Sequence, residues 1–432
     1  MILKKQFWQF LWHLNWIIIL SFWLYQSADH LFSDNPGEVL HALAGLLGFA
    51  AGYSILVQFF LMGRNHWLER SFGLDKLSRL HHDNGRRSLY FLVGHPLLMV
   101  LSYSLLSGTG FFQQFWLLLA NEEILKAALG WVLFLSAAII SIYTALQNLR
   151  YEFWYLTHLV SYAAILLVFS HQFNLGSNLS GNQWFYDYWV LLYLFVFSSL
   201  VYFRFLNPLF NFVKHGFYVA KVIPENYNVN SIYISGKDVD KFRVLPGQFM
   251  IFRFLDAKRW WEAHPFSLSK PNDGKEIRIT PKAVGNFTKE LRNLKPGIRV
   301  IIEGPYGVFT DSESVLPKVL LIAGGIGITP LRSLAEEMRQ KGKDVVLLFS
   351  NKTKQDVVFE KELENIQTLK TLHILTDAEG FLDKEKIQRL VPDFSEREVF
   401  LCGPGPMMSS IRKILKEMGH PVAKLHFEKF SL

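Results

Sequence analysis

The sequence of 432 residues contains a single cysteine, Cys402. One cysteine excludes an intrachain disulfide, an iron–sulfur cluster ligated by cysteines and a covalent haem site of the Cys-x-x-Cys-His type. Any redox cofactor must therefore be held by other residues. Histidine, with 14 copies, is the available metal ligand.

Basic residues outnumber acidic ones, which gives a formal net charge of +8. Much of the excess lies in short segments beside apolar stretches, where anionic lipid head groups are the natural partners. We therefore expect a lipid bilayer and no nucleic acid as a partner. The first two hundred residues are rich in Leu, Ile, Phe and Trp, whereas the rest has an ordinary soluble αβ composition. This contrast predicts a membrane half joined to a soluble half.

Six stretches are apolar enough to span a bilayer, and each is close to the roughly 20 residues required. They are Trp8–Gln26, Val39–Met62, Ser88–Leu106, Ile124–Leu146, Phe153–Phe173 and Tyr188–Leu206. Loops on one side carry the basic residues Arg64, Arg70, Lys76, Arg79, Arg86, Arg87, Arg150, Arg204 and Lys214. The opposite loops carry Asp29, Asp34, Glu38, Glu122 and Glu123, with Lys126 as the basic exception. The positive-inside rule then predicts a multi-pass protein of the plasma membrane with both termini in the cytoplasm.

Two of these spans carry histidine pairs. His81 and His95 are fourteen residues apart, and His158 and His171 are thirteen apart. Either separation is roughly 20 Å along a helix, which suits two haems stacked across the membrane. Haem iron held between two imidazoles is suited to electron transfer. In the expected orientation His81 and His158 would hold an inner haem, and His95 and His171 an outer one.

The spacing also raises a difficulty. Fourteen residues return to within roughly 40° of the same helix face, but thirteen fall about 140° away. The fifth span therefore needs a kink, a π-bulge or divergent side chains. His82 is a rival to His81, and Pro96 can distort its own helix. A lone histidine in a span more often hydrogen-bonds to a neighbouring helix, but four in two tiers favour metal ligation.

The soluble half begins with short alternating segments separated by turns, at Gly216–Val222, Val229–Ser235 and Gln248–Phe254. They predict a small antiparallel barrel. From Val319 onward buried strands alternate with helices, which predicts a doubly wound nucleotide-binding domain. The expected elements there are Val319–Ala323, a helix from Pro330, Asp344–Phe349, a helix near Val357–Ile366, Thr371–Thr376 and Glu398–Cys402.

The barrel region contains the segments His264–Leu268, Lys282–Thr288 and Glu303–Gly307. Phe266 can cover a flavin face, and the Ser267 hydroxyl can bond to the ring near its reactive nitrogen. Gly285 lets the backbone approach a pyrophosphate, Thr288 caps the following helix and Lys282 supplies charge. Each segment alone could be an ordinary turn, but the three in this order indicate a flavin site.

The αβ region opens with Leu321–Pro330, a strand that enters a glycine turn and then a helix able to bind a pyrophosphate. It differs from the Gly-x-Gly-x-x-Gly fingerprint of many dehydrogenases. Its last strand ends in a second loop of small residues, Leu401–Pro406, at the sheet edge where ligands bind. The candidate nucleotide-binding residues are Gly324, Gly325, Gly327, Thr329, Pro330, Cys402, Gly403 and Pro404.

In this order the motifs resemble those of the NADPH oxidase and ferric reductase superfamily, over nearly the whole chain. The resemblance implies that His264, Pro265, Phe266 and Ser267 bind FAD together with Lys282, Gly285, Phe287 and Thr288. It implies that Cys402 positions the nicotinamide and is not a nucleophile. It also implies that an aromatic residue near the C-terminus shields the flavin. Phe430 fits that role best, with Phe427 as its rival and a core phenylalanine as the alternative.

The predicted fold is multi-domain: a six-helix transmembrane di-haem domain at 1–210, an FAD-binding β-barrel at 211–312 and an NAD(P)H-binding α/β domain at 313–432. The last two form a cytosolic module like ferredoxin-NADP reductases. The expected cofactors are FAD, two b-type haems and NADPH, with NADH tolerated, because Ser350–Lys354 offers polar and basic groups for a 2′-phosphate. The sequence has no Asp-rich EF-hand loop and no long Pro-rich tail, so we expect no regulatory subunit to be required.

The expected activity is that of an NADPH oxidase, which passes electrons from cytosolic NADPH through FAD and two haems to extracytoplasmic dioxygen and gives superoxide. A ferric-chelate reductase is the close alternative, since it uses the same parts. The loops on the acidic side carry few basic residues to hold an anionic chelate, which favours dioxygen. A third hypothesis is an electron-delivery subunit for an extracytoplasmic partner protein.

Overall fold

The computed structural model describes residues 2–147, 151–176, 179 and 181–428. The chain divides into two compact units. We call Met1–Ser71 with Lys76–Val201 the helical unit, and Phe72–Asp75 with Tyr202–Leu432 the αβ unit.

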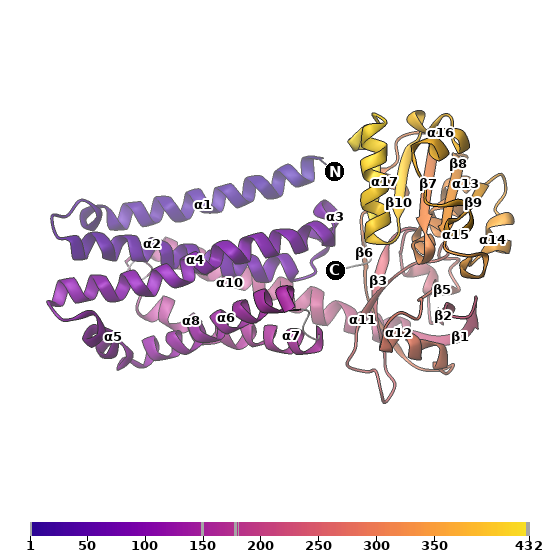
Figure 1. The fold of residues 1–432 in the computed structure, drawn as a ribbon. Coiled ribbons are helices and arrows are strands. Elements are labelled where there is room, and N and C mark those ends of the chain that lie inside the picture. Colours follow the sequence, from indigo (N-terminus) through magenta and orange to yellow (C-terminus); the bar gives the residue numbers. More distant parts are fainter. Residues whose placement is uncertain (1, 148–150, 177–178, 180, 429–432) are drawn as a thin grey trace. The chain divides into compact units, whose positions relative to one another are not determined.

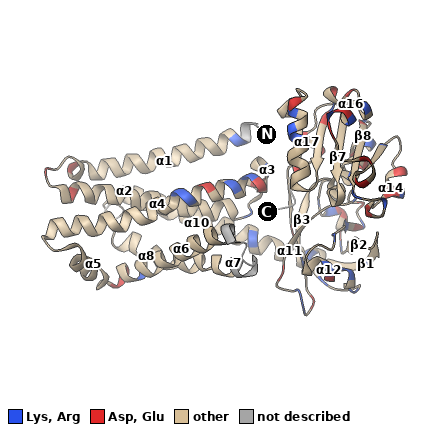
Figure 2. Cartoon of the chain, viewed as in Figure 1, with Lys and Arg blue, Asp and Glu red and all other residues tan. Residues whose placement is uncertain are grey.

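The helical unit is built from long apolar helices that run side by side (Figure 1). Six helices in the described part of the chain are long and apolar enough to cross a membrane, as the six expected spans require. Charged residues are sparse along them and gather toward their ends (Figure 2). The helices of this unit are α1 (Ile2–Leu31), α2 (Pro36–Met62), α3 (His66–Phe72), α4 (Leu74–Ser107), α5 (Phe111–Leu119), α6 (Glu122–Gln147), α7 (Tyr151–His158), α8 (Val160–Asn174) and α10 (Gln183–Val201).

The fifth span is broken, which fits the kink that was one of the alternatives predicted from its histidine spacing. Helix α7 ends at His158 and α8 begins at Val160, with Leu159 as the junction. The Ser161 hydroxyl donates to the carbonyl oxygen of His158 at 2.8 Å, so the interrupted backbone is satisfied locally. The break therefore lies directly after one of the two histidines whose directions it has to reconcile.

The third span remains one helix, α4, although Pro96 lies inside it. Proline has no N–H, so the carbonyl of Leu92 one turn earlier loses its helical donor. The indole Nε1–H of Trp131, in α6, donates to that carbonyl oxygen at 2.6 Å. A side chain of a neighbouring helix thus satisfies the group that the proline leaves open, next to His95.

The αβ unit begins with a π-helix at Tyr202–Leu206 and the short helix α11 (Asn207–His215), so the sixth span departs from regular α-helix earlier than Leu206. A barrel follows, made of two antiparallel sheets in the orders β1-β2-β5 and β4-β3-β6. Single bridges, Leu268 with Ile279 and Tyr218 with Arg299, join the two sheets at both edges. The strands are β1 (Tyr218–Pro224), β2 (Asn230–Ser235), β3 (Phe249–Phe254), β4 (His264–Ser267), β5 (Glu276–Ile279) and β6 (Val300–Tyr306). The expected antiparallel barrel is confirmed.

The second half of the αβ unit is a five-stranded parallel sheet in the order β11-β10-β7-β8-β9. Nearly every residue of β7 is buried, as expected of a strand covered on both faces. The strands are β7 (Lys318–Gly324), β8 (Asp344–Asn351), β9 (Lys370–Leu375), β10 (Glu398–Cys402) and β11 (Leu425–Glu428). The fold class predicted from the sequence is therefore confirmed.

Helices cover both faces of this sheet. Helices α13 (Ile328–Gln340) and α14 (Glu360–Glu364) share a core with one face. Helices α16 (Lys384–Leu390) and α17 (Gly405–Glu417) share a core with the other. The helix expected near Val357–Ile366 is thus shorter than predicted, because a 3-10 turn at Lys354–Asp356 precedes it.

We expect the substitution Trp131→Phe to lower the free energy of unfolding by roughly 0.6 kcal/mol, the average for a hydrogen bond between membrane helices. In a Pro96→Ala background a backbone N–H at position 96 can bond to Leu92 again, so the same substitution should cost less. Denaturant titration of the four proteins in detergent micelles measures this double-mutant cycle. An equal loss in both backgrounds would contradict the role given to Trp131.

Candidate functional site

The helical unit brings His81 of α4 and His158 of α7 together, with ring centroids 6.0 Å apart. Two imidazoles that share one metal ion have centroids at roughly this separation, since each metal–nitrogen bond is about 2 Å long. His82, the rival of His81, is exposed, whereas His81 is half-buried and its Nδ1 has no hydrogen-bond partner in the described part of the chain.

The ring of His158 is held by a hydrogen bond that also fixes its proton. The Ser141 hydroxyl donates to the carbonyl oxygen of Ala137 at 2.7 Å, so its oxygen can only accept from Nδ1 of His158, 3.3 Å away. The proton of a neutral imidazole therefore resides on Nδ1, and Nε2 keeps the lone pair that a metal needs.

In the second pair, His95 and His171, both rings have Nδ1 in a hydrogen bond, as His158 does. Nδ1 of His95 donates to the carbonyl oxygen of Ala44 at 2.8 Å, and Nδ1 of His171 donates to that of Val168 at 2.7 Å. The two histidines are close enough to interact electrostatically. A Cβ atom added to Gly48 of α2 would lie 2.9 Å from the His95 ring, so a glycine is what leaves room for it.

These observations test whether the histidines fit a haem. Three of the four predicted ligands hold Nδ1–H in a hydrogen bond and leave Nε2 as the donor atom. Ligating histidines commonly donate their second nitrogen to a carbonyl or another oxygen in this way. The helical unit therefore has the donor set that two bis-histidine haems need, in two tiers along α4.

In the barrel, the first two predicted flavin motifs meet. The ring of His264, at the start of β4, stacks on Phe287 of the following motif with centroids 3.8 Å apart. Phe266 is half-buried and lies 6.2 Å from the Phe252 ring, Ser267 is buried at the strand end, and Pro265 is exposed. The His264–Phe287 stack thus joins the first two of the motifs expected to bind FAD.

The Gly285 turn is shaped as the sequence predicts. The Thr288 hydroxyl oxygen accepts from the backbone N–H groups of Val284 and Gly285, both at 3.0 Å. It caps a five-residue helix, Asn286–Glu290, from within its first turn. No atom lies within 4 Å of a Cβ added to Gly285, so the backbone there faces open space that a pyrophosphate can enter.

In the nucleotide-binding sheet the two glycine loops pack against each other. Strands β7 and β10 are neighbours, so the loops that follow them meet at one edge of the sheet. A Cβ atom on Gly403 would lie 3.1 Å from the Cα atom of Gly324, and one on Gly327 would collide with the carbonyl oxygen of Cys402. Pro404 is exposed at the rim of this junction, and Gly325 adopts the left-handed φ of +50° that favours glycine.

One detail of the first loop differs from the prediction. Helix α13 starts at Ile328, after a 3-10 turn at Gly325–Gly327, and not at Pro330. The Thr329 hydroxyl donates to the carbonyl of Ile326 at 3.0 Å. Pro330 falls within the first helical turn, where its missing N–H costs nothing.

Cys402 is fully buried at the end of β10, opposite Glu428 in the register of β11. Burial, reinforced by the Glu428 carboxylate, raises the pKa of the Cys402 thiol well above its usual range. The thiol therefore stays neutral, which fits a positioning residue and does not fit a nucleophile. Phe430 lies outside the described residues, and its rival Phe427 stacks under the Arg412 guanidinium at 4.1 Å.

Two candidate residues were missed by the sequence analysis. Glu428 is a buried carboxylate, and its Oε1 is 3.3 Å from where a Cβ on Gly307 of the third barrel motif would lie. Asn351, at the carboxyl end of β8, is buried, and neither polar atom of its amide has a partner among the described residues. Asn351 could have been recognised in the sequence as a polar residue at the end of a buried strand, at the edge where a nucleotide ribose would lie.

Family descriptions match three consecutive parts of the chain. The ferric reductase like transmembrane component matches residues 47–169, the FAD-binding domain matches residues 215–310, and the oxidoreductase NAD-binding domain matches residues 321–413.

Curated relatives match about half of the chain. The glycine betaine monooxygenase reductase subunit of Chromohalobacter salexigens is 30% identical over 240 residues, which is 50% of this chain and 64% of the relative. That of Pseudomonas aeruginosa is 30% identical over 251 residues, or 53% and 68%. The ferredoxin reductase component of 3-ketosteroid-9-alpha-monooxygenase from Rhodococcus rhodochrous is 30% identical over 225 residues, or 49% and 64%. The chain thus spans less than two thirds of the first and third of these relatives.

Because Cys402 is the sole cysteine, its reactivity can be measured without interference. We expect a maleimide to label the native protein more than about tenfold more slowly than the unfolded protein at pH 7.5, since the thiolate is the reactive form. The rate should rise only as the pH exceeds the raised pKa of the thiol. Equal rates in the native and unfolded protein would contradict the buried, neutral thiol.

Proposed function

The chain belongs to the NADPH oxidase and ferric reductase superfamily, as a multi-pass flavoprotein oxidoreductase that uses NAD(P)H, and on that premise we propose that it is an NADPH oxidase. In this proposal electrons from cytosolic NADPH pass by way of FAD and two b-type haems to extracytoplasmic dioxygen and give superoxide. No regulatory subunit takes part. The basic residues in the loops on one side of the helices support a cytoplasmic αβ unit and cytoplasmic termini, with the helices in the plasma membrane.

The observation that carries the proposal is the pairing of four histidines on two spans. His81 lies beside His158, and His95 lies near His171, although each pair joins residues more than 70 positions apart. Hydrogen bonds hold the Nδ1 proton in three of the four, so Nε2 is available as a ligand. A purely structural role would not require Nε2 to be left available in three of the four rings.

The side chains of this protein would position the cofactors and perform no covalent chemistry. When bound, FAD accepts a hydride from the nicotinamide, and haem carries one electron at a time. The His264–Phe287 stack and Ser267 form the wall of the flavin site, and the Gly285 turn leaves open space beside its backbone for the pyrophosphate. The junction of Gly327 with Cys402 brings the nicotinamide-binding loops together, and the neutral thiol adds bulk without charge.

The end of β8 supports NADPH as the preferred donor, with NADH tolerated. Lys352 and Lys354 are exposed there and free to approach a 2′-phosphate. Asp356, the nearest acidic residue, accepts from the Tyr227 hydroxyl at 2.6 Å and from Thr353. The Tyr227 bond, ahead of the Thr353 bonds, holds the pKa of Asp356 below its usual range, so this carboxylate is committed to the protein.

The acidic side of the helical unit supports dioxygen over an anionic ferric chelate. Lys126, the basic exception in those loops, forms ion pairs with Glu122 at 2.6 Å and with Glu123 at 3.3 Å. His30 faces Glu38 at 3.5 Å. Carboxylates thus balance Lys126 and lie beside His30, and an anionic chelate would meet a surface with little attraction for it.

The terminal acceptor is tested by two assays on the purified protein. We expect NADPH-driven reduction of cytochrome c in air that superoxide dismutase abolishes, and an anaerobic rate with a ferric chelate at least about tenfold lower, as expected where the chelate has no cationic site. A faster anaerobic rate with the chelate would make the protein a ferric-chelate reductase. Activity that appears only with an added extracytoplasmic protein would make it an electron-delivery subunit.

The haem sites are tested by counting haem per chain with pyridine haemochrome spectra. We expect two per chain in the native protein and one in each of the variants His158→Ala and His171→Ala, because each removes one ligand of one site. His81→Ala should also lose one haem. The matched control His82→Ala should retain two, since His82 is exposed while His81 faces His158. The opposite outcome for His81 and His82 would exchange their roles.

A further inference from the structure

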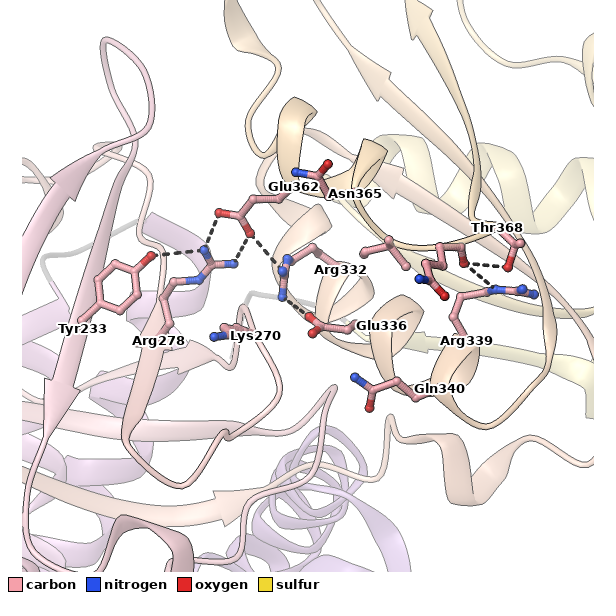
Figure 3. Close-up of a pocket in the computed structure, with 12 residues that line it drawn as sticks. Tyr233, Lys270, Arg278, Arg332, Glu336, Arg339, Gln340, Glu362, Asn365 and Thr368 are labelled. Atoms are coloured by element: carbon pink, nitrogen blue, oxygen red, sulfur yellow. Dashed lines mark hydrogen bonds and ion pairs between the residues drawn. The ribbon is translucent and has the colours of Figure 1, made fainter.

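A polar hollow lies between the barrel and the parallel sheet of the αβ unit (Figure 3). Its volume is about 610 Å³, within the usual range for small-molecule sites. The barrel contributes one wall through β2, β5 and the residues after β4, and helices α13 and α14 contribute the other. Its charged lining consists of Lys270, Arg278, Arg332, Glu336, Arg339 and Glu362.

This hollow is separate from the nucleotide site. The glycine loops follow β7 and β10 and lie at the carboxyl edge of the parallel sheet. Gln340 and Thr368, which line the hollow, lie shortly before the starts of β8 and β9 and therefore belong to the opposite edge. A nucleotide bound at the glycine loops consequently leaves the hollow free.

Two buried arginines form its floor. The Arg278 side chain is 2% exposed and forms a bidentate pair with Glu362, at 2.7 and 3.0 Å. Arg332, 7% exposed, bonds to Glu336 at 2.7 Å and to Glu362 at 3.0 Å. Two carboxylates balance these two guanidinium groups, and that balance makes their burial tolerable.

The basic side chains that line the hollow outnumber the acidic ones. Lys270 and Arg339 add two positive charges to the lining, which has four basic side chains and two acidic ones. Arg339 donates to the backbone carbonyls of Gln367 and Lys343, which carry no charge. Lys270 pairs with Asp273 at 2.9 Å, but Asp273 does not line the hollow.

One hydrogen-bond donor in the lining has no acceptor among the described residues. The Nε–H group of Arg332 is buried and has no hydrogen-bond partner among the described residues. Burial, and then the positive charge of Arg278, lowers the pKa of Arg332. An unsatisfied buried donor beside an excess of basic side chains is where an anion is stabilised.

We propose that this hollow binds a small phosphate-bearing anion that bridges the barrel and the nucleotide-binding sheet. Guanidinium groups match phosphate oxygens with paired N–H donors, and Arg332 retains one such donor. Lys270 comes from the barrel and Arg339 from α13, so a bound anion would contact both halves of the αβ unit. The proposal needs neither haem nor electron transfer and therefore stands or falls independently of the function proposed above.

Isothermal titration calorimetry of the full-length protein in detergent tests this, with inorganic pyrophosphate as the probe at constant ionic strength. We expect one saturable site per chain, with affinity unchanged when NADP⁺ saturates the nucleotide site. Lys270→Ala and Arg339→Ala should each weaken binding by about tenfold, the effect of losing one charge-assisted hydrogen bond. The matched control Lys413→Ala removes the same charge from α17 on the other face of the sheet and should bind as the native protein does.

Absence of a saturable site, or loss of binding when NADP⁺ is present, would overturn the proposal. It would also be overturned by equal effects of Lys270→Ala and Lys413→Ala, which would indicate an unspecific response to net charge. Arg339 also bonds to backbone carbonyls, so its variant can unfold. Lys270→Ala alone then decides the outcome, because the ion pair that it removes is with the exposed Asp273.

Discussion

The helical unit depends on one geometric constraint: two histidines thirteen residues apart have to face the same neighbouring helix. An unbroken α-helix would turn the second ring about 140° away from the first. The end of α7 at His158 and the new start of α8 at Val160 interrupt the helix between the two histidines. On the partner side α4 runs unbroken, because a spacing of fourteen residues already keeps His81 and His95 on nearly one face. Hydrogen bonds to Nδ1 then fix the orientation of three rings, so backbone geometry and proton position together set the two tiers.

The αβ unit meets a comparable requirement by different means. Loops separated by more than 70 residues have to meet around one nicotinamide, and adjacent parallel strands bring them to one sheet edge. Only glycine tolerates the resulting contact of Gly327 with Cys402 and of Gly403 with Gly324. The barrel solves the same problem with a side-chain stack, His264 on Phe287, which joins two motifs that are distant in sequence. In the sheet and in the barrel, close packing holds the motifs together.

The sequence was sufficient for the spans, the barrel strands and the parallel strands, because each depends on local hydrophobic pattern and turn residues. It also predicted that the fifth span needs a kink, a π-bulge or divergent side chains, since helical periodicity is fixed, but it could not locate the break at Leu159. The bond from Trp131 to Leu92 was beyond prediction, because it depends on which helix packs beside Pro96. Glu428 and Asn351 were missed for the same reason: each gains its significance from the strand or loop placed opposite it. The start of α13 was misplaced because proline is tolerated anywhere in a first helical turn.

Some buried polar groups in this protein are paired within the chain, and others have no partner among the described residues. Trp131 donates a hydrogen bond to the carbonyl oxygen of Leu92, and the carbonyl oxygen of Ala44 accepts one from His95. In both cases a neighbouring helix supplies the partner of a buried polar group. Arg332 and Asn351 are among the buried side chains with a polar atom that has no partner in the described part of the chain; Arg332 lines the hollow, and Asn351 lies at the carboxyl end of β8. A buried donor or acceptor that stays unpaired costs about 1–3 kcal/mol. A ligand that supplies the missing hydrogen-bond partner recovers that free energy on binding. The unpaired group therefore lowers the stability of the free protein and raises its affinity for the ligand.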